Sequence, residues 1–319
     1  TRSHRTRKDP ELVRFGERVF NVNATYVRDG GGKTSLSLGY QAGGRKRGIV
    51  DGKEVARLSE MVGRCGVVLV SPEDVEITSG EPERRRHFLD LTLCSVDAVY
   101  LRLLQEMARI LKQRGQILRD TWESNRARLL EPWDRQLAAT GFEVTMARKR
   151  AIEELAPHVA AAYAGLVPGG EALAVRYRPG IGREVETEEA VFEKIVARRE
   201  DDMRLKRTTV GPHRDDIALD LDERSIRSYG SRGQHRSAVL SLKIGASRLM
   251  RDRLGEEPIL LLDDVFTELD AGRSDRLAGM LGEAGQVFAT GTERAGLGRY
   301  FPGAIRFSFG EGGALLREE

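Results

Sequence analysis

Apolar and polar positions alternate along the first seventy residues in the manner of antiparallel β-strands. Three stretches show this period of two, at 19–27, 35–40 and 48–50, and glycine-rich turns separate them. A shorter and uniformly apolar run, Val67–Val70, is typical of a buried strand, and it leads into Ser71-Pro72-Glu73-Asp74. We therefore expect a small antiparallel sheet followed by one core strand.

From about residue 88 to 170 the apolar spacing becomes that of amphipathic helices. Apolar residues recur every three or four positions from Val96 to Leu111, and again from Leu137 to Val159. Pro132 lies between the two runs, so we expect two long helices divided near this residue. Successive long helices favour an antiparallel pair that projects from the core.

Strands and helices alternate in the rest of the chain. The patterns predict a strand at 172–177, a charged helix at 186–207, a strand at 217–221, a helix at 273–281, and strands at 286–289 and 304–309.

The stretch from Ser228 to Asp270 has a more specific order. A polar, glycine-bearing turn at 228–236 opens a helical pattern that Gly255 and Pro258 should end. A glycine-rich turn at a helix start directs backbone N–H groups and the positive end of the helix dipole at its surroundings, which suits an anion. Turns of this kind are also common in proteins that bind nothing there.

A buried strand, Ile259–Leu262, follows and ends in Asp263 and Asp264. Paired aspartates at the end of a buried strand suit Mg²⁺, which takes one or two carboxylates together with substrate phosphates. The alternative is a core strand that meets a solvated turn. Because the anion turn and the carboxylates stand so close in sequence, their order favours nucleotide chemistry.

Composition narrows the range of partners and compartments. The chain has 319 residues, enough for two domains, and a net charge of only +3, so no global basic field indicates nucleic acid. Nine of its 52 basic residues are lysine and the others arginine, which suits phosphate-rich partners but would also follow from a GC-rich genome. Cys65 and Cys94 form no ligand cluster, as expected in a reducing cytoplasm. No apolar run approaches the ~20 residues of a membrane span.

Three short sequences imitate phosphate-binding or catalytic motifs. Gly32-Lys33-Thr34 and Gly52-Lys53 lack the earlier glycine of a P-loop, so we interpret both as hairpin turns. His213-Arg214-Asp215 has the order of a kinase catalytic triplet, but Asp220 stands where a kinase needs Asn. By spacing alone this segment is a loop.

Three segments together resemble one family. They are Pro72-Glu73-Asp74 through Gly80, Pro82 and Arg84–Asp90, then Gly211–Asp216, and finally the turn, strand and Glu268-Leu269-Asp270 of the 228–270 stretch. In this order they resemble the RecF branch of the SMC-like ABC-type ATPases. Without that resemblance, the triple arginine Arg84–Arg86 would be interpreted as a solvated helix face.

The resemblance implies an α/β fold of the ABC-type ATPase head, with a mixed sheet, an antiparallel β subdomain and an inserted helical lobe. The implied division is an N-terminal ATPase part at 1–87, the helical lobe at 88–207 and a C-terminal ATPase part at 208–319. RecF proteins form ATP-dependent dimers, bind gapped or junction DNA, and work with RecR and RecO to load the recombinase. ATP and Mg²⁺ are the implied cofactors, and no membrane is involved.

Each candidate site residue is assigned by its place in the resembling motifs. Asp263 corresponds to the Mg²⁺ ligand of the Walker B strand, and Asp264 to the catalytic carboxylate that orients or activates water. Many ABC-type ATPases have glutamate there, so the shorter aspartate implies slow turnover. The signature turn supplies the residues that would contact the partner's ATP, and the D-loop follows the Walker B strand. The nucleotide-binding candidates are Ser231, Gly233, Gln234 and Arg236 of the signature turn and Glu268 and Asp270 of the D-loop.

The family's switch histidine has no counterpart, and Thr290 and Thr292 occupy its position. The family's first strand and P-loop would precede Thr1, and the 319 residues contain no P-loop sequence. We expect a truncated sequence rather than a natural pseudo-ATPase. The open functions are a DNA-binding repair ATPase, a non-catalytic DNA- or protein-binding module on the same scaffold, and a head from another nuclease or SMC family.

Overall fold

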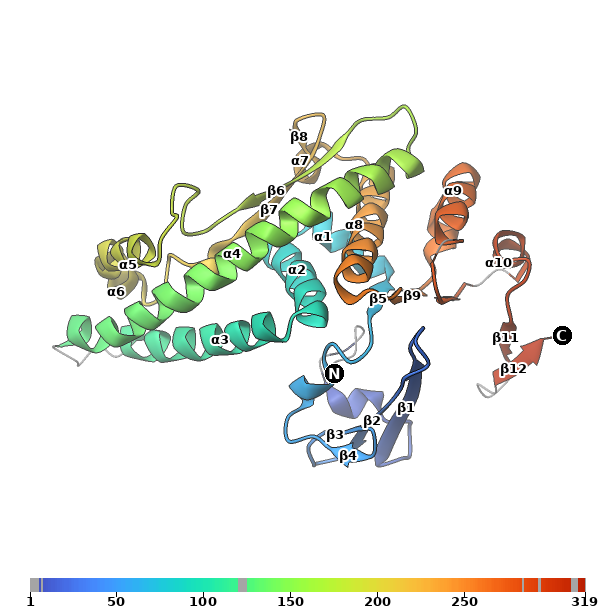
Figure 1. Ribbon diagram of the computed structural model, residues 1–319, viewed down its shortest axis with the longest axis horizontal. Coiled ribbons are helices and arrows are strands. Elements are labelled where there is room, and N and C mark those ends of the chain that lie inside the picture. The colour runs from blue at the N-terminus through green and yellow to red at the C-terminus, as the bar shows by residue number, and fades with distance from the viewer. Residues whose placement is uncertain are drawn as a thin grey trace.

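The computed structural model describes residues 6, 8–119, 125–282, 284–291, 294–310 and 315–318 (Figure 1). The chain contains both strands and helices, as expected of an α/β protein, and its buried apolar residues form two hydrophobic clusters. No helix in these ranges combines the length and the hydropathy that a bilayer crossing requires.

A four-stranded antiparallel sheet in the order β1-β2-β3-β4 lies below the rest of the molecule in Figure 1. Lys33 begins β2 and Lys53 begins β4, so both glycine–lysine sequences lie in hairpins, as predicted. The elements of this part are η1 (Asp9–Leu12), β1 (Val19–Val27), β2 (Lys33–Gln41), β3 (Arg47–Val50), β4 (Lys53–Glu54) and η2 (Leu58–Met61).

A three-stranded parallel sheet in the order β10-β9-β5 lies at the centre of a second α/β part. Helix α8 packs against it, and Val70, Leu240 and Leu262 share one buried cluster. Gly255 ends α8 in the left-handed conformation that glycine adopts without strain, with φ 71°, which confirms the predicted stop. The elements are β5 (Val67–Val70), α8 (Arg232–Leu254), β9 (Ile259–Leu262), η5 (Val265–Glu268), α9 (Ala271–Leu281) and β10 (Val287–Ala289).

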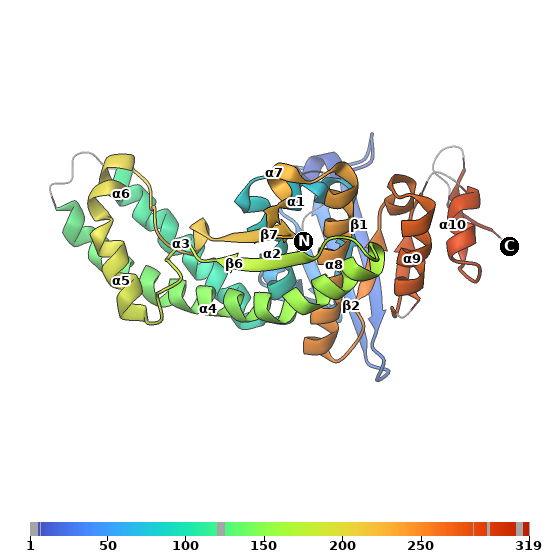
Figure 2. The ribbon, with the colours of Figure 1, turned by 90° about the horizontal axis from the view of Figure 1, so that it is seen from above.

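The helical part lies at the end of the molecule opposite α10 and the C-terminus (Figure 2). The prediction that Pro132 divides the two long helices is wrong, because this proline lies inside α4 and α3 already ends at Arg119. The predicted helix at 186–207 is two helices that meet at Arg198. The elements are α2 (Pro82–Val96), α3 (Ala98–Arg119), α4 (Arg126–Leu166), α5 (Glu188–Ala197) and α6 (Arg199–Leu205).

A second antiparallel sheet, β6-β7-β8, runs along α4 and leads the chain back to α8 and the parallel sheet. The C-terminal hairpin of β11 and β12 forms a separate two-stranded sheet. The remaining elements are η3 (Pro72–Val75), α1 (Glu76–Ser79), β6 (Leu173–Arg178), η4 (Pro212–Arg214), β7 (Asp216–Leu221), β8 (Arg224–Ser225), α7 (Ile226–Tyr229), α10 (Arg294–Tyr300), β11 (Arg306–Phe309) and β12 (Leu315–Glu318).

A buried ion cluster joins the helical part to the segment that precedes β7. The Arg148 side chain on α4 is 2% exposed, and it donates to Asp215 Oδ2 at 2.6 Å, to Asp90 Oδ1 at 2.8 Å and to the Pro212 carbonyl at 2.7 Å. Tyr177 also donates to Asp215. Burial raises the pKa of Asp215, although Arg148 opposes that rise. The Gly211–Asp216 motif is therefore a structural joint that fastens three separate segments.

The three consecutive arginines of α2, Arg84–Arg86, lie in different environments, from the core to the surface. Arg85 is 4% exposed, and its Nε lies 2.7 Å from Asp216 Oδ1. Arg86 donates to the Asp215 carbonyl at 2.7 Å. Only Arg84 pairs at the surface, with Glu76. The interpretation as a solvated face is thus wrong for Arg85.

His213, in the same joint, should make folding stability depend on pH. Burial lowers its pKa to about 4, and nearby Arg214 adds to the effect. In the unfolded chain the imidazole titrates near 6.5, so the unfolded state binds more protons between these values. Stability should therefore be lost as the pH falls from about 6.5 to 4, by up to about 3 kcal/mol. Urea unfolding of wild type and His213→Gln across this range measures it. The variant should lose that slope, and equal slopes would contradict the assignment.

Candidate functional site

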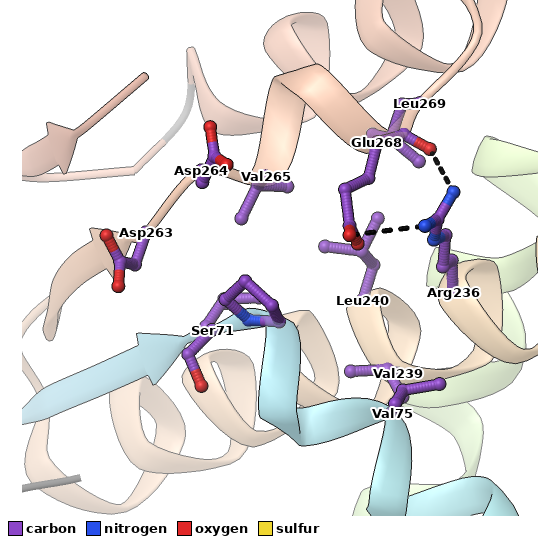
Figure 3. Close-up of a pocket in the computed structure, with 12 residues that line it drawn as sticks. Ser71, Val75, Arg236, Val239, Leu240, Asp263, Asp264, Val265, Glu268 and Leu269 are labelled. Atoms are coloured by element: carbon purple, nitrogen blue, oxygen red, sulfur yellow. Dashed lines mark hydrogen bonds and ion pairs between the residues drawn. The ribbon is translucent and has the colours of Figure 1, made fainter. Parts of the chain in front are cut away.

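The carboxyl ends of two parallel strands place the candidate carboxylates. Val70 of β5 pairs with Leu262 of β9, and the Asp263 N–H donates to the Val70 carbonyl at 2.8 Å. Ser71 and Asp263 are therefore adjacent at one edge of the sheet (Figure 3). This is the edge at which open α/β sheets bind ligands.

Asp264 has two features that no sequence pattern indicated. Its backbone is left-handed, with φ 57° and ψ 25°, which is uncommon outside glycine. One carboxylate oxygen, Oδ1, is buried and has no hydrogen-bond partner in the described part of the chain. A strained backbone and an unsatisfied buried oxygen both carry an energetic cost and are frequent at functional sites. The local structure thus presents a carboxylate ready to accept an additional group.

Thr290, which follows β10, connects the two aspartates. Its hydroxyl donates to Asp263 Oδ1 at 2.7 Å and accepts from the Asp264 N–H at 3.2 Å. The Thr290 N–H in turn donates to the Leu262 carbonyl at 2.9 Å. Sequence comparison had indicated only the position of Thr290, and this contact gives it a role in orienting the carboxylates. Thr292, the other residue at that position, lies outside the described residues.

The carboxylate oxygens in this site fit Mg²⁺ better than a metal ion whose ligands all come from the protein. No group of three or more acidic, histidine or cysteine side chains occurs among the described residues in an arrangement that could hold an ion. Mg²⁺ needs only one or two carboxylates when phosphates and water complete its shell. Asp263 alone meets that smaller requirement, and the unsatisfied Oδ1 of Asp264 stays available to another group.

The candidate residues occupy two neighbouring places. Ser71, Arg236, Asp263, Asp264 and Glu268 line one pocket, which we name the carboxylate pocket (Figure 3). In it Arg236 Nη1 donates to the Glu268 carbonyl at 2.8 Å, and Nη2 lies 3.2 Å from Glu268 Oε1. The signature turn and the D-loop are thus linked within the chain.

The other candidates lie outside this pocket, at the start of α8 and of α9. Ser231 and Gln234 form a capping box, in which Gln234 Oε1 accepts from the Ser231 N–H at 2.7 Å and Ser231 Oγ accepts from the Gln234 N–H at 3.3 Å. Gly233 lies between them. Asp270 caps α9 and accepts from the Arg273 N–H at 2.9 Å. That hydrogen bond lowers the pKa of Asp270. Of the signature turn, Arg236 lines the pocket that holds Asp263 and Asp264, whereas Ser231, Gly233 and Gln234 do not.

Three supporting residues were missed from the sequence. Ser71 follows a buried strand, as the aspartates do, and this signal could have indicated it. Lys243 of α8 donates to Asp74 at 2.8 Å and to the Leu69 carbonyl at 2.7 Å, which fixes the turn after β5. Burial lowers the pKa of Lys243. Glu171 accepts a hydrogen bond from Gln234 Nε2 at 2.6 Å. Neither the contacts of Lys243 nor this one could be predicted from the neighbouring sequence.

Comparison with known proteins assigns the family. No protein-family model matches the sequence. The DNA replication and repair protein RecF of Moorella thermoacetica is 39% identical over 294 residues, which cover 92% of this chain and 77% of that protein. The chain belongs to the RecF family of DNA replication and repair proteins. The RecF of Agathobacter rectalis is 34% identical over 285 residues, covering 89% of this chain and 77% of that protein.

Solved structures confirm the predicted ABC-type ATPase head. A RecF structure described as a recombination mediator protein with ATPrS in the RecFOR pathway has a TM-score of 0.82 and 30% identity, over 92% of this chain and 80% of that one. A second RecF structure, described with ATP, has a TM-score of 0.81 with the same identity and coverage. An SMC head shares the fold alone, with a TM-score of 0.50 and 12% identity, over 98% of this chain and 80% of that one.

Proposed function

We propose that this RecF chain is an ATP-dependent DNA-binding protein of recombinational repair that acts as a dimer with ATP between the subunits. The observation that carries the proposal is Asp264, whose left-handed backbone and unsatisfied carboxylate oxygen lie beside Asp263 in the carboxylate pocket. RecF structures described with ATP and ATPrS, which share this fold, support the choice of nucleotide.

In this proposal the described residues divide the chemistry between two subunits. Asp263 holds Mg²⁺, which supplies positive charge against the phosphate oxygens. Asp264 orients the attacking water or accepts its proton. Thr290 hydrogen bonds to the Asp263 carboxylate and to the Asp264 backbone N–H, and so orients both residues for their different roles. Ser231, Gly233, Gln234, Glu268 and Asp270 form the surface that meets the partner's ATP. The proposed parts are residues 1–87 and 208–319 for the ATPase and 88–207 for the helical lobe.

DNA and the other mediators complete the proposal. The chain would bind gapped or junction DNA in its ATP-bound dimer and cooperate with RecO and RecR in loading the recombinase, as the RecFOR pathway named for the solved relatives suggests. Fluorescence anisotropy with gapped and blunt duplexes, with and without ATP and Mg²⁺, tests this on a chimera in which the P-loop segment of a RecF relative precedes Thr1. ATP should tighten binding to the gapped duplex, and equal binding under all four conditions would overturn the proposal.

A second candidate is a non-catalytic DNA-binding module. Calorimetric titration separates the two, first on this chain and then on a chimera in which the P-loop segment of a RecF relative precedes Thr1. We expect no micromolar ATP binding by the chain alone, because the β- and γ-phosphates lack their cradle, and binding by the chimera. DNA binding that is equal in both, and independent of ATP, would favour the non-catalytic module.

Ser231→Arg should separate nucleotide binding from dimerisation in the chimera. Ser231 is exposed at the start of α8, outside the carboxylate pocket, so each monomer should still bind ATP. A bulky side chain in a close contact with the partner's phosphate would clash, and ATP-induced dimerisation should be lost. Sedimentation velocity with and without ATP measures the dimer. If Ser231→Arg dimerises like the parent, the signature turn does not face the partner's nucleotide.

A matched variant distinguishes a clash with the partner's phosphate from a simple loss of the helix cap. Ser231→Ala removes the side-chain cap of α8 without adding bulk, and loss of such a cap costs about 1 kcal/mol of stability. It should retain more dimerisation than Ser231→Arg. An equal loss in both variants would assign the effect to the cap.

A further inference from the structure

The signature turn and the helix after the D-loop fit together at Gly233. A Cβ atom built on Gly233 would lie 2.7 Å from Nη1 of Arg273, closer than real Cβ atoms approach other atoms. Arg273, on α9, thus places its guanidinium in the space that any larger residue at 233 would fill. Because Nη1 is the far end of a flexible side chain, a larger residue at 233 would displace the guanidinium rather than clash with fixed atoms. The contact between Gly233 and Arg273 arises inside the chain and needs no ligand.

A second arginine makes the reciprocal contact. Arg236 of α8 reaches the D-loop and binds both the carbonyl and the carboxylate of Glu268. Arg273 of α9 reaches back to the signature turn, and its Nε lies 3.5 Å from Asp270 Oδ2. Only a quarter of the Arg273 side chain is exposed. Arg236 therefore bonds α8 to the D-loop, and the Arg273 guanidinium of α9 lies against Gly233 at the start of α8.

We propose that Arg273 is a positioning residue, which holds the signature turn in a defined orientation relative to the D-loop. Its rigid, planar guanidinium suits this role, because a flexible ammonium could not fill the same flat space against Gly233. The proposal rests on the proposed function in one respect, namely that the turn and the D-loop face the same partner. A shift of either segment is then transmitted to the other.

A double-mutant cycle tests the contact in this chain without nucleotide. Alanine is the better residue in a helix, so Gly233→Ala should by itself stabilise α8. In the wild-type background it should raise the urea midpoint by less than the helix preference alone predicts, because the methyl group displaces the Arg273 guanidinium from its contact. In the Arg273→Ala background the same change should raise the midpoint by the full amount. Equal effects of Gly233→Ala in the two backgrounds would overturn the proposal.

The chain offers a matched control for this cycle. Gly279 lies on α9 itself, and a Cβ there would meet nothing within 4 Å. Gly279→Ala should change the midpoint by the same amount whether residue 273 is arginine or alanine. Coupling at Gly279 as large as at Gly233 would show that Arg273→Ala disturbs α9 in general, and the specific contact would then be rejected.

Dimerisation of the chimera tests the positioning role. Arg273→Ala should leave ATP binding by monomers unchanged and raise the ATP concentration needed for dimerisation about tenfold, within the range of coupling between contacting residues. Arg273→Lys should fail to restore it. If Arg273→Ala dimerises like the parent, Arg273 does not position the turn. If the parent itself does not dimerise with ATP, the proposed function fails, and the stability cycle alone decides the Gly233–Arg273 contact.

Discussion

Arg148→Met is expected to lower the free energy of unfolding by about 3–5 kcal/mol. The arginine is almost fully buried, and it neutralises Asp90 and Asp215 while satisfying the Pro212 carbonyl. Methionine keeps much of the volume but leaves two carboxylates without their cation in a medium of low polarity. Breaking a buried pair from one side costs more than the pair contributes, because the remaining charge is uncompensated. Equilibrium unfolding in urea, followed by circular dichroism, measures the loss.

Arg150→Met is the control, because Arg150 is exposed on the same helix. A surface substitution of this kind should change stability by no more than about 0.5 kcal/mol. Adding Asp90→Asn to Arg148→Met should recover part of the loss, since it removes one of the stranded charges. A cost for Arg148→Met no larger than that of the control would mean that the cluster does not hold the joint.

Asp264→Asn is expected to slow ATP hydrolysis by the chimera ~10²-fold or more, the range for a positioned general base. Asparagine has the shape of aspartate and tolerates the left-handed backbone at this position, with φ 57°, so the fold of the turn should be kept. The amide cannot accept a proton from water as the carboxylate can. ATP binding should persist, and the variant should accumulate as an ATP-bound dimer. Phosphate release and sedimentation velocity measure the two effects.

Asp275→Asn provides the comparison for this variant. Asp275 lies on α9 and pairs with Arg299 at the surface, 3.1 Å away. It should hydrolyse ATP like the parent. Unchanged turnover in Asp264→Asn would assign the base to another residue, and lost ATP binding would indicate that Asp264 serves the nucleotide or the metal instead.

The sequence predicted those parts of the fold that depend on neighbouring residues. The glycine–lysine hairpins, the stop at Gly255 and the strand that ends in Asp263 each follow from local conformational preference. The family, and with it the ABC-type ATPase head, followed from three separated motifs. The roles of the individual site residues stay predictions, because geometry places them without showing a reaction.

The rest depended on contacts between distant segments. Arg148 finds Asp90 and Asp215, which are 58 and 67 positions away, and no periodicity indicates such partners. Pro132 was expected to end a helix, but Leu130 and Leu137 are fully buried on either side, and this packing outweighs the loss of one backbone hydrogen bond. The left-handed conformation of Asp264 is likewise imposed by its surroundings.

Helix α4 has the proportions of a lever. Its 41 residues correspond to a length of ~60 Å, and at its C-terminal end Arg276 of α9 donates to the Leu166 carbonyl at 2.9 Å. The opposite end carries α5 and packs along α3 (Figure 2). A tilt of about 5° where α4 meets α9 would move the far end by about 5 Å over such a length. If α4 tilted as a rigid rod together with α9, the helix that follows the D-loop, its far end would therefore move by about the pitch of a helical turn.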